Sequence, residues 1–131
     1  MSPRQRSGPL ESADPGATLT NAGIAAVLVE IADLLEIRGE SSFKVAAYRR
    51  AADSVARCGT DVAMAYREGD PPTLRGVGGG ISERIGELST TGHLAYHESL
   101  RAEVPPTLLE MLSIPGVGPR TAGDVWRTLG I

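Results

Sequence analysis

Cysteine, aromatic residues and long apolar runs are scarce in this sequence of 131 residues. The only cysteine is Cys58, so the chain can form neither an intramolecular disulfide nor a cysteine-based metal site. Aromatic residues make up 4%, so the core must be built from Leu, Ile, Val and Ala. No apolar run approaches the roughly 18 residues that a membrane span needs, and the first residues lack an apolar signal segment. We therefore expect a protein of the reducing cytoplasm that makes no contact with membranes.

Lysine is also scarce, and the balance of charge is acidic. The formal net charge is −3, and Lys44 is the only lysine. This balance argues against a strong general attraction to nucleic acid, because non-specific DNA affinity usually comes from cations that replace counterions. Residues 38–67 carry a local basic excess, with six basic and three acidic side chains. Such a patch is typical of solvated surface as well as of an anion-binding face.

Apolar residues recur at helical spacing along most of the chain, which predicts an all-α fold. Residues 1–19 are the exception, since they are rich in Pro, Gly, Ser and Ala, and we expect them to form a disordered tail. Residues 20–103 are predicted to form a helical domain that contains a first glycine turn between helices. Residues 104–131 are predicted to form a second pair of helices around another glycine turn. We expect a monomer with helices at about 21–38, 42–58, 61–68, 80–89, 94–103, 105–113 and 119–129.

The predicted helix at 42–58 has an apolar stripe and a polar flank. Its spacing assigns the stripe to Val45, Ala52, Val55 and Ala56. The neighbouring flank carries Lys44, Tyr48 and Arg49. A lysine and a tyrosine one helical turn apart can reach the same anion. A half-buried packing role is an equally good interpretation of Tyr48.

Two segments of the sequence repeat the same pattern around a glycine triplet. Residues 74–88 read LRGVGGGISERIGEL, and residues 114–129 read IPGVGPRTAGDVWRTL. Each segment places Gly-Val-Gly directly before an amphipathic helix. One such triplet is weak support, but two copies in one short chain indicate the duplication of one structural unit. The repeat therefore predicts two helix-hairpin-helix units.

Glycine at these turns suits contact with a phosphate group. A tight turn between helices needs backbone angles that are costly for other residues, and the missing Cβ lets a phosphate approach the main chain. The next helix begins there, with unpaired N–H groups at the positive end of its dipole. Phosphate contacts carry no base information, so the binding should not depend on DNA sequence. We expect the DNA-binding residues to be Lys44, Tyr48, Arg49, Arg75, Gly76, Gly78, Gly79, Gly80, Arg84, Gly116, Gly118, Arg120 and Thr121, with charge also from Arg50 and Arg127.

Other interpretations of the glycine turns remain open. The turns could be purely structural, since glycine bends between helices are common. A nucleotide-binding loop at 76–80 is less well supported, because no β-branched strand precedes it. The acidic charge balance and the single lysine favour a third alternative, a helical protein-interaction module.

Four stretches of the sequence resemble the amino-terminal domain of family-X DNA polymerases, the bacterial ones especially. They are EIADLLEIRGESSFKVAAYRRAADSV, LRGVGGGISERIGEL, LRAEVP and LSIPGVGPRTAGDVWRTLGI, which agree in order from about residue 21 to the end. The resemblance implies a polymerase-beta-like fold that binds gapped or nicked DNA in base excision repair. It also implies a polymerase palm domain if the chain is part of a longer protein. In the family the first hairpin meets the downstream strand of a gap, and the second meets the primer side.

The resemblance also implies ligands around each turn. It assigns Lys44 and Tyr48 to a pocket for the 5′-phosphate at a gap. Backbone carbonyls are expected to ring one monovalent cation, Na+ or K+, at each hairpin. At the first hairpin they are those of Pro72, Leu74 and Val77, and at the second those of Leu112, Ile114 and Val117. We expect no other cofactor.

Some residues depart from what catalysis in the family requires. Family members that remove a 5′ deoxyribose phosphate form a Schiff base on a lysine, and the matching position here is Arg84. An arginine stays protonated and cannot be that nucleophile, so only a weak lyase using Lys44 or the terminal amine is left as an alternative. The paired carboxylates of nucleotidyl transfer are absent. His93 and His97 share one helix flank, but without a third ligand we interpret them as solvated rather than metal-binding.

Overall fold

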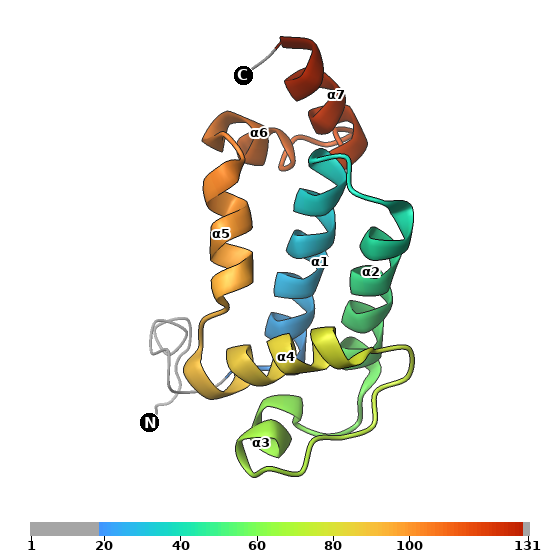
Figure 1. Ribbon diagram of the computed structural model, residues 1–131, viewed down its shortest axis with the longest axis vertical. Coiled ribbons are helices and arrows are strands. Elements are labelled where there is room, and N and C mark those ends of the chain that lie inside the picture. The colour runs from blue at the N-terminus through green and yellow to red at the C-terminus, as the bar shows by residue number, and fades with distance from the viewer. Residues whose placement is uncertain (1–18, 130–131) are drawn as a thin grey trace, which may run out of the picture.

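The computed structural model describes residues 19–129, and every regular element within that range is a helix. Figure 1 shows the path of the chain. The predicted all-α fold is therefore confirmed for the described part of the chain, whereas the predicted tail lies outside it except for Leu19. The helices are α1 (Asn21–Ile37), α2 (Ser42–Arg57), α3 (Val62–Arg67), α4 (Gly79–Thr91), α5 (Ala95–Glu103), α6 (Pro106–Met111) and α7 (Pro119–Leu129).

Short polar side chains cap the first three helices. The hydroxyl of Thr20 accepts a hydrogen bond from the Gly23 amide at the start of α1, 3.0 Å away. Ser41 does the same at the start of α2, and Asp61 at the start of α3. These side chains satisfy backbone donors that a helix leaves without an internal partner.

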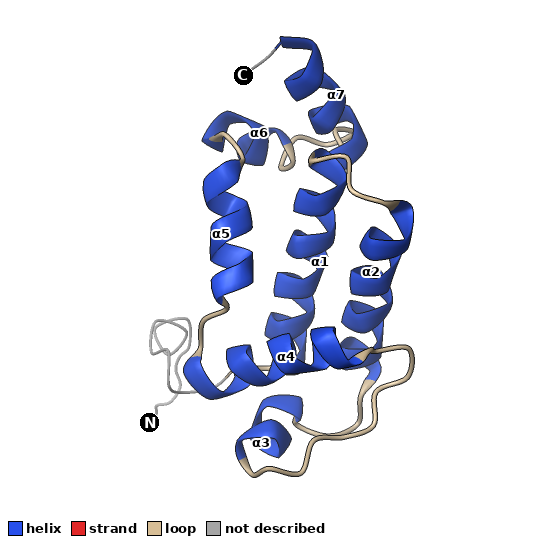
Figure 2. Cartoon of the chain, in the orientation of Figure 1, coloured by secondary structure: helices blue, strands red, loops and turns tan. Residues whose placement is uncertain are grey.

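Helix α1 forms the centre of the core. Its buried face includes Ile24, Leu28, Ile31 and Leu35, the apolar positions at helical spacing. Figure 2 shows α2 and α5 alongside α1, while α4 crosses beneath these helices. The core is made almost entirely of aliphatic side chains, as the scarcity of aromatic residues requires.

The buried stripe of α2 differs from the prediction at three positions, since it includes Ala51 and Tyr48 and leaves out Ala56. Val45, Ala52 and Val55 are buried as expected, but Ala56 is exposed. Tyr48 is only 2% exposed and takes a place in the stripe. The reason is the helical period, because Tyr48 lies three residues after Val45 and four before Ala52.

Helix α4 extends two residues beyond the predicted break and ends at Thr91. The Thr90 hydroxyl donates a hydrogen bond back to the Gly86 carbonyl at 2.9 Å. The Thr91 hydroxyl likewise bonds the Glu87 carbonyl at 2.8 Å. Threonine here bonds the preceding turn instead of breaking it, and Gly92 then ends the helix in a left-handed conformation. Helix α6 differs in the other direction and ends at Met111, before the predicted boundary.

Helix α7 packs closely on the C-terminal end of α1. A Cβ atom at Gly123 would lie 2.9 Å from the Ile37 carbonyl oxygen, so only glycine fits at this crossing. Arg127 donates to the same carbonyl from 3.3 Å, which satisfies an acceptor at the end of α1. Ala122 belongs to the buried core. The second hairpin is therefore anchored to the central helix.

Candidate nucleic-acid interface

The first glycine turn is exposed and fixed to α2. Gly76 has a φ of +77°, a conformation that favours glycine over residues with a side chain. The Ser54 hydroxyl of α2 donates a hydrogen bond to the Arg75 carbonyl. A Cβ at Gly76 would meet only the side chain of Arg50, at 3.9 Å. The turn is thus held from one side and open to solvent on the other.

The N-terminus of α4 follows this turn and has no side-chain cap. Gly78 precedes the helix and makes no side-chain capping bond within the described residues. The first N–H groups of a helix have no acceptor within it. Apart from adjacent residues and the backbone of α4 itself, no described atom lies within 4 Å of where a Cβ would stand at Gly78, Gly79 or Gly80, and none of the three has a positive φ. The fold itself therefore does not require glycine at these three positions.

The second turn repeats the backbone geometry of the first. Gly116 has a φ of +87°, and the Val117 amide bonds the Ile114 carbonyl at 3.0 Å. In the first turn the equivalent bond joins Val77 to Leu74 at 3.3 Å. At Gly118 a Cβ would again find no described atom within 4 Å. The duplication seen in the sequence is therefore a duplication of structure.

The predicted cation ligands of the first hairpin share one cavity. Pro72, Leu74 and Val77 line a hollow of about 290 Å³. The carbonyls of Leu74 and Ile114 already accept one hydrogen bond each inside their turns. A carbonyl oxygen has a second lone pair, so both remain able to act as ligands. This donor set of neutral oxygens suits Na+ or K+ and not a transition metal.

Each of the two histidines lies beside a glutamate. No group of three or more His, Cys, Asp or Glu suited to a metal ion occurs among residues 19–129. His93 is exposed and lies 3.3 Å from Glu98. His97 differs from the prediction of a solvated side chain: it is 15% exposed, and its Nε2 lies 3.2 Å from Glu30 of α1. The packing of α5 on α1 explains this burial.

Arginine side chains fall into two groups. Five of them have a carboxylate within 4 Å, namely Arg38, Arg49, Arg57, Arg101 and Arg127. Within the described range the others have none, namely Arg50, Arg67, Arg75, Arg84 and Arg120. Arg67 instead bonds the Ser89 carbonyl. The remaining four lie in the hairpins, in the helices that follow them, or, for Arg50, beside the first turn.

Arg49 is occupied by other interactions, although its type and position predicted a DNA contact. Its Nη2 lies 3.1 Å from Asp33 and 2.9 Å from Glu36, both on α1. Burial raises the pKa of Asp33, and the hydrogen bond from Arg49 opposes that effect. The adjacent Arg50 has no such partner among the described residues and carries the available charge on this part of α2.

Lys44 and Tyr48 lie one turn apart but in different environments. The Lys44 side chain is half exposed, and its ammonium is 3.9 Å from Glu40. Tyr48 is buried, and its hydroxyl accepts a hydrogen bond from Nη1 of Arg84 at 3.1 Å. Burial raises the pKa of Tyr48 above its ordinary value of 10.0, so the hydroxyl is neutral at physiological pH. Tyr48 is therefore a packing residue that also holds Arg84.

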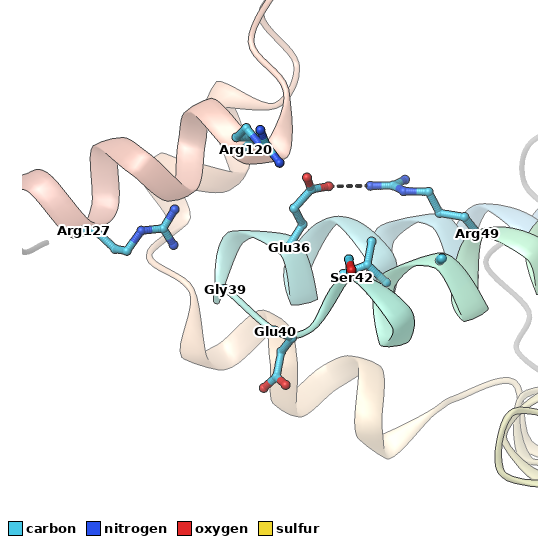
Figure 3. A pocket seen from close by; sticks show the side chains of 9 residues that line it. Glu36, Gly39, Glu40, Ser42, Arg49, Arg120 and Arg127 are labelled. Atoms are coloured by element: carbon cyan, nitrogen blue, oxygen red, sulfur yellow. Dashed lines mark hydrogen bonds and ion pairs between the residues drawn. The ribbon is translucent and has the colours of Figure 1, made fainter.

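Helix α2 connects the surroundings of the two hairpins. At one end Ser54 contacts the first turn. At the other end a cavity of about 360 Å³ separates Ser42 and Arg49 from Arg120 and Arg127 of α7. Figure 3 shows these side chains around the cavity, with the Glu36 to Arg49 pair beside Arg120. Since α2 has 16 residues, it is about 24 Å long, and the two hairpins lie near its opposite ends.

Two aromatic residues near this surface were not among the expected DNA-binding residues. Phe43 is the only phenylalanine and is 86% exposed in the first turn of α2. Its position outside the apolar stripe, next to Lys44, was the available signal. Tyr96 of α5 lies under the guanidinium of Arg84, with 3.8 Å between Cζ and the ring centroid. No local pattern predicts that contact, because it joins separate helices.

This arrangement defines an all-helical protein with two exposed glycine hairpins. The family of helix-hairpin-helix domains matches residues 19–94, which is more than half of the chain. The chain therefore belongs to the helix-hairpin-helix domain family.

The sequence is also similar to that of the DNA polymerase/3′-5′ exonuclease PolX of Bacillus subtilis (strain 168). The two are 32% identical over 108 residues, which is 82% of this chain and 18% of that protein. The predicted resemblance to family-X polymerases is thus confirmed, while the chain spans less than a fifth of this relative's length. Among the helices of residues 19–129, none combines the length and apolar character that a bilayer crossing needs.

Proposed function

We propose that the chain binds DNA through its phosphates, independently of sequence, with one helix-hairpin-helix turn on each side of a gap or nick. The observation that carries this proposal is the open space in front of Gly78, Gly79, Gly80 and Gly118. Glycine in a helix costs about 0.5–1 kcal/mol relative to alanine. Neither a positive φ nor the packing of the fold requires glycine at these positions. The close approach of a phosphate to the main chain does require it.

The distribution of charge supports the same surface. Arg50, Arg75, Arg84 and Arg120 have no carboxylate partner among residues 19–129, and all lie at or near the hairpins. A net charge of −3 is therefore compatible with DNA binding, because carboxylates such as Asp33, Asp53 and Glu30 are paired with arginines other than these four. The similarity to the Bacillus protein, a DNA polymerase/3′-5′ exonuclease, supports nucleic acid as the ligand.

The separation of the hairpins favours gapped or nicked DNA over an intact duplex. The two turns lie near opposite ends of α2, a helix about 24 Å long. Each hairpin can then hold the phosphates of a different strand segment. Phe43, exposed on α2, is available to stack on an unpaired base, as aromatic side chains do in single-strand binding. This role in DNA repair is part of the proposal.

A monovalent cation at each hairpin is the accompanying proposal. Neutral carbonyls of each turn would hold Na+ or K+ on the side opposite the N-terminus of the helix that follows. Such a cation would also attract the phosphate bound to the amides. No lyase step is assigned to the chain, because Arg84 stays protonated and is held by Tyr48.

Fluorescence anisotropy with labelled DNA tests the proposal. The probe is a duplex with a one-nucleotide gap and a 5′-phosphate, titrated at low salt. The wild type should bind it, and Gly118→Val should lose at least tenfold in affinity, because its side chain occupies the open space at the second turn. Gly59→Ala is the matched control, since its Cβ also meets no described atom but lies in the connection between α2 and α3.

Circular dichroism separates a binding defect from a folding defect. Both variants should keep the helix content of the wild type. Normal binding by Gly118→Val would show that the second hairpin is only structural. A wild type that does not bind gapped DNA even at low salt would favour the protein-interaction alternative.

A further inference from the structure

The cavity of about 360 Å³ between α2 and α7 combines charged and apolar walls. Its volume lies in the range of sites that hold small molecules. Val45 and Ala46 of α2 form an apolar part of the lining. Arg120 of α7 and Glu36 of α1 also line the cavity and give it groups of both charges. The cavity can therefore receive a ligand that is apolar in one part and polar in another.

Arg120 is the available cation of this cavity among residues 19–129. The other two arginines that line it are ion-paired, Arg49 with Glu36 and Arg127 with Asp124. Arg120 has no carboxylate of the described chain within 4 Å. It is the second residue of α7, so the cavity opens beside the amides that are proposed to hold a phosphate at the second hairpin. A nucleobase joined to that phosphate can therefore reach the cavity.

Glu36 supplies an acceptor inside the same cavity. Its Oε1 accepts a hydrogen bond from Arg49 at 2.9 Å, whereas Oε2 makes none within the described range. Figure 3 shows the carboxylate between Arg49 and Arg120. A carboxylate paired with an arginine only accepts hydrogen bonds, so it disfavours a phosphate at this point and favours a group with N–H donors. The exocyclic amino group of a nucleobase is such a donor, and the base itself suits contact with a guanidinium.

We propose that this cavity receives one unpaired nucleobase with an exocyclic amino group, next to a phosphate held at the second hairpin. Glu36 accepts a hydrogen bond from the amino group, and the guanidinium of Arg120 lies against the ring. Cytosine carries such a group at N4, whereas thymine has a carbonyl oxygen and a methyl group on the same edge. This inference rests on the proposed function and adds to it a preference at one unpaired position. Paired DNA is still bound through its phosphates alone.

Two single-stranded oligonucleotides of equal length, all dC or all dT, test this inference. They carry the same phosphates and differ only in their bases. The measured quantity is the ratio of their affinities for the full chain, by fluorescence anisotropy at mildly alkaline pH. The wild type should bind the dC strand about fivefold to tenfold more tightly. Glu36→Gln should bring the ratio close to one, because an amide can donate a hydrogen bond to thymine as well as accept one from cytosine.

The control for Glu36→Gln is Asp33→Asn. Asp33 also pairs with Arg49, at 3.1 Å, but it does not line the cavity. Both variants release Arg49 in part, and only Glu36→Gln alters the cavity. Asp33→Asn should therefore keep the wild-type ratio of affinities.

A second pair of variants tests the space in the cavity without changing any charge. Ala46→Leu places a larger side chain in the cavity and should also bring the ratio close to one. Ala56→Leu makes the same change at an exposed position of α2 outside the cavity, and it should keep the ratio. Circular dichroism should show the helix content of the wild type in both variants.

Each outcome supports or overturns the inference. Equal affinities of the wild type for the two strands overturn it, as does a wild-type ratio that survives in Glu36→Gln or Ala46→Leu. An equal loss of the ratio in Asp33→Asn overturns the role of Glu36. A wild type that binds the duplex with a one-nucleotide gap but neither single strand overturns the inference and leaves DNA binding intact. A wild type that binds none of the three DNAs overturns the proposed function as well.

Discussion

Replacing Gly80 with alanine should make the protein more stable and a weaker DNA binder. Gly80 is the second residue of α4, has no positive φ, and offers open space to a Cβ. Alanine in such a position stabilises a helix by about 0.5–1 kcal/mol relative to glycine. For a domain of this size, that gain corresponds to an increase in melting temperature of about 2–4 °C.

The same methyl group should interfere with phosphate binding. It stands beside the unpaired amides of the first turn of α4, where the phosphate is proposed to lie. A hydrogen bond to a charged group contributes about 1.5–3 kcal/mol. Loss or lengthening of one such bond should weaken DNA binding about tenfold or more. The expected result is therefore a change of opposite sign in stability and in affinity.

Thermal unfolding and anisotropy on the same samples measure both effects. Gly59→Ala serves as the control, because it also replaces an exposed glycine of ordinary φ but lies away from the hairpins. It should leave DNA affinity unchanged. If Gly80→Ala gains stability and binds DNA as tightly as the wild type, the glycine does not serve phosphate approach and the reasoning is refuted. If it loses stability, the space in front of α4 is not open in solution.

Four other predictions concern residues outside the glycine turns. The logarithm of DNA affinity should fall with the logarithm of salt concentration with a slope of about −3 to −4. Arg50→Ala should make this slope shallower by about one, whereas Arg49→Ala should leave it unchanged because Arg49 is already ion-paired. Equal effects of the two variants on the slope would contradict the pairing argument. Gly123→Ala should destabilise the fold by about 1–3 kcal/mol through overpacking, since its Cβ would lie 2.9 Å from a carbonyl oxygen; an unchanged melting temperature would show that α7 is not docked on α1. Borohydride trapping on a 5′ deoxyribose-phosphate end should give no strong adduct, and a strong adduct lost in Lys44→Ala would reveal a lyase. Burial raises the pKa of Tyr48, so the folded state keeps the hydroxyl proton to a higher pH than the unfolded state does. The free energy of unfolding should therefore fall as pH rises from about 10. Tyr48→Phe should remove the contribution of Tyr48 to this fall, as measured by unfolding at a series of pH values.

The local features of the fold were predictable from the sequence. Helical spacing in α1 and short polar caps such as Ser41 depend on neighbouring residues alone, and both are present in the structure. The paired turns at Gly76 and Gly116 were predictable for the same reason, because the left-handed backbone conformation of such a turn favours glycine. The prediction ended α4 before its threonines and was wrong there, since Thr90 donates a hydrogen bond to the preceding turn and the helix continues.

The pairing of charges could not be predicted, because it depends on contacts between helices. Arg49 and Arg50 are adjacent and identical in type, yet only Arg49 meets the carboxylates of α1. A helix turns by about 100° per residue, so neighbouring side chains face different surroundings. The contact of Tyr96 with Arg84 likewise joins α5 to α4 and leaves no signal in either segment. A sequence can therefore identify candidate cations, but not which of them remain available to a ligand.

An NMR titration of the backbone amides with 5′-phosphorylated gapped DNA tests the central claim most directly. The amide signals of Gly79, Gly80 and Gly118 should move downfield as they form hydrogen bonds with phosphate oxygens. The amide of Gly59 should not move. Saturable DNA binding that shifts signals elsewhere but leaves all three hairpin glycines unchanged would contradict the claim that these amides hold the phosphates.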